Sequence, residues 1–216
     1  MGIVYYHKND LRKDIIDGVD MTDADVSNIR DLSYLLAGLV DANPNMTKWD
    51  VSSVVNMDYL FFGCTYFNVD ISKWNVTCAS TMEGMFMNTL QFNQNIGSWD
   101  VRNVGNTKRM FYNAKAFNRN ISGWKLPKYC QVTDMFYGAK SFVQDLSSWK
   151  PNVCLEHTTA NSKKRKNKKM ASKSRPLKDK PQSTKPDIVR DEHIATLYIL
   201  VVVQLVLMVY MFITGY

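Results

Sequence analysis

The sequence has little of what catalysis or metal binding usually requires. Its 216 residues include only three histidines and four cysteines, and the cysteines form no CxxC pair. Zinc sites need Cys and His at short, regular spacings, and no Ser/His/Asp or Cys/His set is recognisable either. We therefore expect no metal, no cofactor and no catalytic residue, so the chain is not expected to be an enzyme.

The N-terminus lacks the pattern of a secretory signal. Its opening, MGIVYYHKNDLRKD, has only a few apolar residues before charges intervene, which is too short for the apolar core of a signal peptide. Excess charge is also missing outside one segment. Residues 161–193 hold twelve Lys or Arg against four Asp or Glu, a surplus of +8 in a chain whose net charge is +7. The remaining residues therefore sum to −1, and the basic character belongs to this segment.

What the sequence does contain is a repeat of 25 residues, which is the primary signal for a stacked architecture. All the tryptophans of the chain lie on this period: Trp49, Trp74, Trp99, Trp124 and Trp149. Phenylalanine repeats in two further columns: Phe61, Phe86, Phe111 and Phe136, and then Phe67, Phe92, Phe117 and Phe142. Five units thus span residues 25–149.

The spacing inside a unit predicts its local structure. Apolar residues recur at i, i+3, i+4 and i+7, as from Met57 to Cys64, which predicts a helix of about two turns. A polar turn follows, and then a short extended piece in which Trp99 and Val101 share one face of a strand. No unit could bury its apolar face alone, so we expect the units to stack into one core.

The repeated tryptophans and the repeated asparagines could each serve either the packing of the protein or the binding of a ligand. We interpret the tryptophans as core packing rather than a ligand cage. A column of asparagines, Asn68, Asn93 and Asn118, is interpreted as a buried ladder that bonds the backbone of neighbouring coils. A polar binding stripe is the alternative for the asparagines.

The segments MFMNTLQFNQNIGSWDVRNV (85–104) and MFYNAKAFNRNISGWKL (110–126) resemble the BspA-like surface-protein repeat, once labelled as a mycoplasma domain of unknown function. The resemblance covers about residues 25–149. It implies an α/β repeat solenoid, leucine-rich-repeat-like, with a short helix, a turn and a short strand per unit. It also implies a role in adhesion or protein contacts and brings no catalytic residues. We expect an N-terminal cap at 1–24 and a C-terminal cap at 150–160.

Residues 161–193 lose the apolar periodicity and are expected to form a disordered basic tether. The tether contains a run of cations: Lys163, Lys164, Arg165, Lys166, Lys168 and Lys169. We favour contact with anionic lipid head groups over a solvated spacer, and either of these over a nucleic-acid arm. Nucleic acid is not the expected partner.

Residues 194–216 run for 23 residues without a charge, long enough to cross a bilayer core about 30 Å thick. We expect a single transmembrane helix there. The basic tether then favours the cytoplasmic side for the solenoid. Three glycosylation triplets, at Asn45, Asn75 and Asn120, oppose that orientation. We interpret them as unused, because such triplets arise easily in an Asn/Ser/Thr-rich repeat. If the domain were exported, Cys130 and Cys154 in adjacent coils could pair.

The sequence thus predicts a membrane-anchored interaction or structural protein whose solenoid binds a protein partner. One specific form is a virion membrane-associated or minor capsid protein of a large DNA virus, because the resembled family occurs in such viruses. The alternative is a cell-surface adhesin with an exported, glycosylated solenoid.

Overall fold

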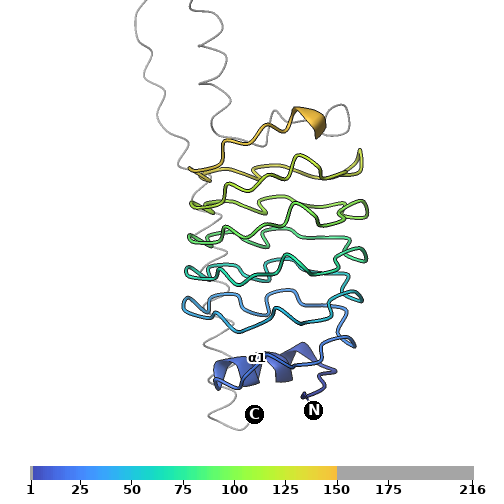
Figure 1. Cartoon of the computed structure of the whole chain (residues 1–216), viewed down its shortest axis with the longest axis vertical. Helices are drawn as coiled ribbons and strands as arrows, with labels where there is room; N and C mark the ends of the chain where they lie inside the picture. The colour runs from blue at the N-terminus through green and yellow to red at the C-terminus, as the bar shows by residue number, and fades with distance from the viewer. Residues whose placement is uncertain (1, 150–216) are drawn as a thin grey trace, which may run out of the picture. The chain divides into compact units, whose positions relative to one another are not determined.

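Repeated coils stacked on one another make up the part of the chain that the structure describes (Figure 1). A computed structural model describes residues 2–149. Helix α1 (Lys8–Ile16) lies at one end of the stack, and a single 3-10 turn, η1 (Ser147–Trp149), lies in the last coil. Between them the coils are joined by isolated parallel bridges, one residue per coil. The bridging residues recur every 25 positions: Asp31, Asn56, Thr81, Asn106 and Gln131.

The prediction of a short helix in each unit is wrong. Some N–H groups of the segment donate to the next coil, and the others donate within their own coil. Each coil is one 25-residue unit, so that the second coil is residues 50–74. There, every other N–H of the segment donates to the third coil: Tyr59 donates to the carbonyl of Glu83 and Phe61 to that of Met85. The N–H groups between them close turns within the coil, as from Phe62 to Tyr59. An α-helix would instead use every N–H on a carbonyl four residues back. The turns keep the i, i+3, i+4, i+7 side chains on the core side, so the burial pattern is that of a helix.

A left-handed backbone occurs twice in each of these segments and breaks any helix. One position recurs at Tyr34, Tyr59, Gly84, Arg109 and Asp134, with φ between 55° and 60°. The other recurs four residues later at Gly38, Gly63, Asn88, Asn113 and Gly138. Helices of L-residues tolerate no regular αL positions. The glycine or asparagine at the second position is part of a continuing turn.

The predicted strand around Trp99 and Val101 is also not formed. Trp99 donates its N–H to Ile96, and Val104 donates to Val101, both over three residues, so these segments are turns. The parallel bridging falls instead at Thr81 and its equivalents. Trp99 and Val101 are nevertheless both buried, at 4% and 1% exposure. The sequence therefore indicated the inward side chains correctly and the backbone conformation incorrectly.

Helix α1 covers the first coil and supplies it with hydrogen-bond donors. Leu11 is fully buried and Ile15 packs against the core. In the later coils, a row of carbonyls receives N–H groups from the preceding coil. The first coil has no preceding coil, and side chains of α1 take that role: Lys8 Nζ donates to the carbonyl of Ser33 at 3.1 Å, and Arg12 donates to Leu35 and Ala37. This row of carbonyls is thus satisfied by cations rather than by backbone.

One core runs from Tyr5 to Trp149 and combines the inward columns of all five units with Tyr5, Leu11 and Met21 from the N-terminal residues. Aromatic rings stack from coil to coil. Phe86 lies 5.3 Å from Phe61 and 5.5 Å from Phe111, centroid to centroid, and only 3.9 Å from Phe92 of its own coil. Each coil therefore packs against its two neighbours, as expected for stacked repeats.

Gly84 offers a test of this packing. It is the one glycine among the five residues of its left-handed column, and a Cβ there would collide with the ring of Tyr59. We expect Gly84→Ala to destabilise the stack by about 3 kcal/mol, from overpacking and a left-handed φ together. Gly18→Ala is the matched control, because Gly18 has φ +78° with no atom within 4 Å. It should lose about 1 kcal/mol. Denaturation followed by tryptophan fluorescence measures both, and equal losses would show that Tyr59 is not the cause.

The described residues include no helix long and apolar enough to cross a bilayer. The C-terminal cap predicted at 150–160, the tether at 161–193 and the transmembrane helix at 194–216 lie outside them, as do Cys154 and the basic run from Lys163 to Lys169.

Candidate interaction surface

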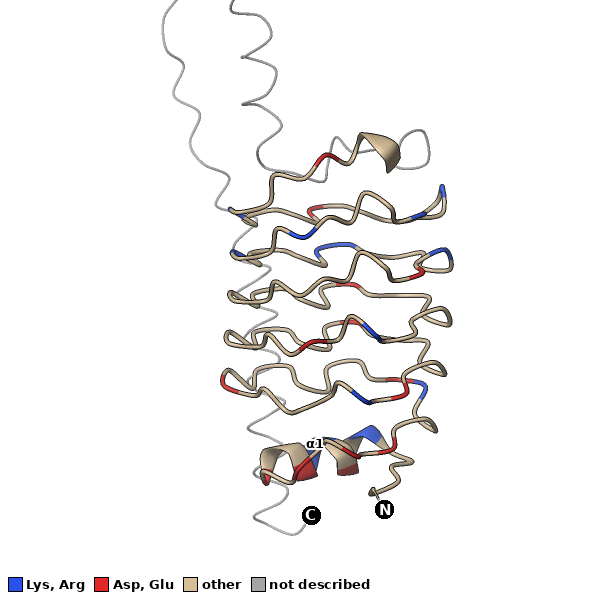
Figure 2. Ribbon diagram, in the orientation of Figure 1, with Lys and Arg blue, Asp and Glu red and all other residues tan. Residues whose placement is uncertain are grey.

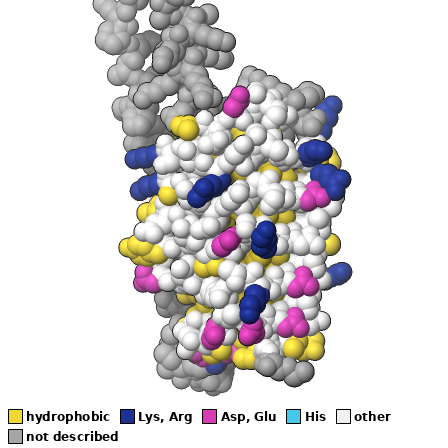
Figure 3. All heavy atoms as spheres, in the orientation of Figure 1, with side chains coloured by type: hydrophobic (Ala, Val, Ile, Leu, Met, Phe, Trp, Pro, Cys, Tyr) yellow, Lys and Arg dark blue, Asp and Glu magenta, His cyan; other side chains and the backbone are white. Residues whose placement is uncertain are grey.

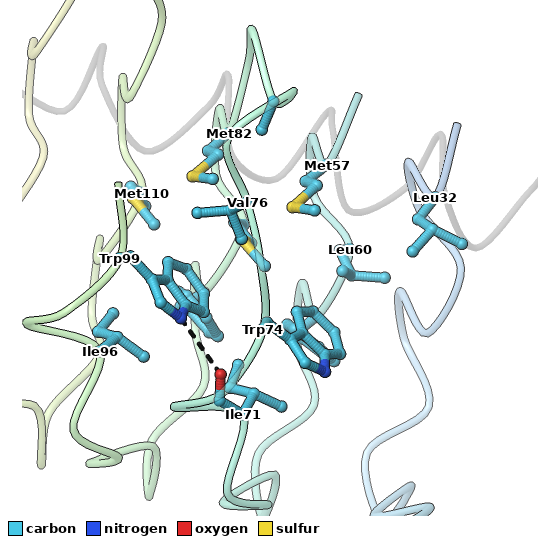
Figure 4. Close-up of a cluster of buried hydrophobic side chains, with 14 of the residues drawn as sticks. Leu32, Met57, Leu60, Ile71, Trp74, Val76, Met82, Ile96, Trp99 and Met110 are labelled. Carbon is cyan, nitrogen blue, oxygen red and sulfur yellow. Dashed lines mark hydrogen bonds between the residues drawn. The ribbon is translucent and has the colours of Figure 1, made fainter. Parts of the chain in front are cut away.

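The tryptophan column lies inside the stack, where each indole is anchored to the coil before it. Successive rings are nearly parallel, with centroids 6.3 to 6.5 Å apart. Each Nε1–H donates to a carbonyl 28 residues earlier, as from Trp99 to Ile71 at 3.2 Å (Figure 4). All five indoles are at most 4% exposed. Their faces are occupied by one another, which leaves no slot for a ligand.

Both phenylalanine columns also lie in the core, with one exception. Phe61, Phe86 and Phe111 are fully buried and Phe136 is 3% exposed. In the other column, Phe142 is only partly buried and packs against the edge of the core in the last coil.

The asparagine column bonds neighbouring coils along one face. Asn68 Oδ1 accepts the N–H of Asn93 at 2.9 Å, and Asn93 Oδ1 accepts that of Asn118 at 3.1 Å. The ladder starts one coil earlier than the sequence indicated, because Asn43 Oδ1 accepts the N–H of Asn68. It is not buried as expected, since Asn68 is exposed. Position 43 shares the 25-residue column and could have been found from it.

The three glycosylation triplets all form the same turn. In each, the asparagine Oδ1 accepts the N–H two residues on, as from Thr77 to Asn75 at 3.2 Å. Asn45 and Asn120 do the same, and all three asparagines are exposed. Aspartates make the identical turn in other coils, for example Asp70 with Ser72. The triplets therefore have a structural explanation as Asx turns in which asparagine replaces aspartate.

The cysteines within residues 2–149 are free thiols in different surroundings. Cys64 is fully buried, and burial raises the pKa of its thiol to about 12. Burial also raises the pKa of Cys130, whose sulfur lies 3.6 Å from Thr107 Oγ1. Cys78 is exposed. Since the thiolate is the reactive form, the three differ in reactivity.

We expect N-ethylmaleimide at pH 8 to label Cys78 within minutes and to reach Cys64 and Cys130 only after denaturation. Peptide mapping by mass spectrometry distinguishes the sites. Cys78→Ser should remove the native labelling of the stack, and rapid native labelling of Cys64 would contradict its burial.

A cluster of tyrosines and charges lies on the face that carries the parallel bridges, and no sequence pattern indicated it. Tyr34 and Tyr59 stack at 5.0 Å, and Tyr59 Oη donates to Glu83 at 2.8 Å. Burial is the main cause that raises the pKa of Tyr59, and the hydrogen bond to Glu83 raises it further. Glu83 also lies 3.7 Å from Lys108 Nζ. Partners in successive coils stand about 25 positions apart, so only knowledge of the stacking brings them together.

Asp58 in the same cluster is half-buried. Its carboxylate accepts hydrogen bonds from Thr81 Oγ1 at 2.5 Å and from the N–H of Glu83 at 2.6 Å. Burial raises its pKa all the same. Both donors belong to the next coil, so the carboxylate ties two coils together. Within residues 2–149, no three His, Cys, Asp or Glu side chains are grouped so as to hold a metal ion.

Charge changes sign along the stack (Figure 2). Residues 2–74 hold eleven Asp against six Lys or Arg, whereas residues 75–149 hold four Asp or Glu against eight Lys or Arg. The inward columns repeat almost unchanged while the outward ones vary: one outward column reads Asp41, Tyr66, Gln91, Ala116 and Ser141. Conserved inward positions with variable outward ones are typical of repeat scaffolds that bind through their surface.

Together these features define the class of the protein: a stacked-coil repeat protein with a 25-residue unit. The chain matches the family described as "Mycoplasma protein of unknown function, DUF285" over residues 5–124, 30–149 and 79–173, and it belongs to that family. The first two matches are displaced by one repeat. The match is consistent with the BspA-like resemblance. No curated protein and no solved structure matches the chain significantly.

Proposed function

We propose that this protein is a non-enzymatic, membrane-anchored interaction or structural protein whose stack binds a protein partner. The observation that carries the proposal is the contrast between constant inward and variable outward columns on a stack joined coil to coil by hydrogen bonds. A scaffold of this kind holds its outward side chains in fixed positions, which lowers the entropy lost on binding. Recurring carboxylates such as Asp70 and Asp145 accept N–H groups within turns, which is a structural use.

The membrane anchor of this proposal is the uncharged segment 194–216, and the tether 161–193 supplies the cations for anionic lipid. With the tether on the cytoplasmic side, the stack is cytoplasmic too. Glycosidase treatment tests this orientation. No mobility shift is expected, and a shift abolished by Asn45→Gln, Asn75→Gln and Asn120→Gln together would overturn it.

Crosslinking in native membranes, followed by identification of the attached proteins, tests the interaction itself. Partner crosslinks within residues 2–149 are expected. Crosslinks confined to lipid, with none to protein, would contradict the proposal. In its virion form, the protein should also copurify with particles and remain with their membrane fraction.

A cell-surface adhesin is the second candidate. The exposure of Asn45, Asn75 and Asn120 favours it, because glycosylation needs accessible asparagine. It requires the stack to lie outside the cell, so protease added to intact cells should remove the stack. Full protection from the protease, with cleavage after permeabilisation, would exclude it.

A further inference from the structure

The end of the stack that carries α1 has a short segment, Ile3–Tyr5, whose outer edge is unpaired within residues 2–149. Val4 pairs with Asp25 in a parallel bridge: Tyr5 donates its N–H to the carbonyl of Asp25, and Asp25 donates to Ile3, both at 2.9 Å. In this pattern the N–H and C=O of Val4 itself point to the opposite side, away from the first coil. Within residues 2–149 neither group has a hydrogen-bond partner. Such an edge is a template for another strand.

Large apolar side chains are exposed on the segment 3–6 and around the C-terminal end of α1. Residues 3–19 contain five of the twelve exposed large apolar side chains found in the described part of the chain. They are Ile3, Val4, Tyr6, Ile16 and Val19, exposed by 37% to 67%. Figure 3 shows apolar and acidic side chains next to each other at the end of the stack where α1 lies. Exposed apolar residues in one place mark contact sites more often than isolated ones do.

The same end presents negative charge, because its cations are already engaged. Lys8 and Arg12 turn inward to the carbonyls of the first coil, and Lys13 bonds Asp17 at 2.7 Å. Residues 2–25 contain those three cations against six aspartates. Asp10 and Asp20 are among the exposed ones. Asp17 is paired with Lys13 and Asp23 with Lys48, whereas Asp10 and Asp20 form no ion pair within residues 2–149, so these two carry outward negative charge.

We propose that this edge binds an extended, basic segment of another protein, which adds as a strand along Ile3–Tyr5 and places Lys or Arg side chains near the aspartates. This inference rests on the proposed function and names the class of its partner. Main-chain hydrogen bonds to Val4 would give affinity and the charges would give selectivity. The same end of a second copy is acidic and an anionic membrane is negative, so both are repelled.

The test uses the full chain in detergent micelles and a fluorescent probe, the peptide Lys-Val-Lys-Val-Lys-Val, followed by anisotropy. Binding is expected to weaken with added salt. Val4→Pro, which removes an N–H that bonds nothing in the stack, should weaken binding at least tenfold. Asp10→Asn with Asp20→Asn should weaken it several-fold and reduce the salt dependence. Val4→Lys, which places a cation on the proposed edge, should also weaken binding of the basic probe. Val143→Lys, at a 65% exposed apolar position far along the chain, is its matched control and should change nothing.

A Glu-Val probe of equal length should show no binding that depends on Val4. Thermal unfolding followed by tryptophan fluorescence confirms that each variant is folded. Equal binding of the Lys-Val probe to wild type and to folded Val4→Pro, or no binding at all, would overturn the inference. Partner crosslinks found only at other coils would also overturn it while leaving the proposed function intact, whereas the absence of any protein crosslink would remove the proposed function itself.

Discussion

Replacing Arg12 by methionine is expected to destabilise the stack by about 3 kcal/mol, although the residue lies outside the repeats. Its guanidinium donates to the carbonyls of Tyr34, Leu35 and Ala37, and methionine keeps the apolar stem while removing every donor. A carbonyl left without a partner is destabilising by about 1–3 kcal/mol when water cannot replace the donor. Leu35 and Ala37 are at most 2% exposed, so water reaches their carbonyls poorly.

Lys13→Met in the same helix is the control. Lys13 is exposed and bonds only Asp17, so its replacement should have no measurable effect on stability. Urea denaturation with tryptophan fluorescence as the signal measures both variants. All five tryptophans lie within residues 49–149, so the signal reports on the stack and not on the tether. Equal stabilities of the two variants would show that the carbonyl row does not depend on Arg12.

Phe86→Ala is expected to cause the largest loss of any single truncation, about 4 kcal/mol. The ring is fully buried in the middle coil and stacks on Phe61, Phe92 and Phe111. Its removal leaves a cavity that both neighbouring coils line. Because coils contact only their neighbours, weakening the middle one also uncouples the two halves of the stack. The urea transition should therefore broaden as well as move to lower urea.

Phe142→Ala provides the comparison for this variant. Phe142 belongs to a phenylalanine column too, but it is only partly buried and lies in the last coil. Its loss should be about half as large or less, because less apolar area returns to water, and the transition should stay sharp. A sharp transition with a loss below about 1 kcal/mol for Phe86→Ala would contradict nearest-neighbour coupling.

The inward columns could be predicted from the sequence, because the tendency to be buried depends on each side chain by itself. The same apolar side chains also recur every 25 residues. Trp99, Phe111 and their equivalents follow from the 25-residue period alone. The backbone conformation could not, because spacings of three and four fit both a helix and a succession of three-residue turns. The choice between them depends on the N–H groups of residues such as Tyr59 and Phe61, which bond the next coil.

The contacts on the candidate surface could likewise be predicted from the sequence only in part. The asparagine ladder was visible as a column. The contact of Tyr59 with Glu83 joins different residue types in two coils, and that of Lys8 with Ser33 joins α1 to the first coil. Nothing in their spacing marks them. The open edge at Val4 was equally hidden, since it depends on which side of a single bridge faces Asp25.

The five equal units, the apolar side chains of each unit and the concentration of charge in one segment can all be read from the amino-acid sequence. The path of the chain within a unit, the groups that close the first coil and the edge that stays open depend on the stacked coils. Hydrophobic burial is a property of each side chain, whereas a hydrogen bond between coils needs a partner about 25 residues away, whose position exists only after the coils have stacked.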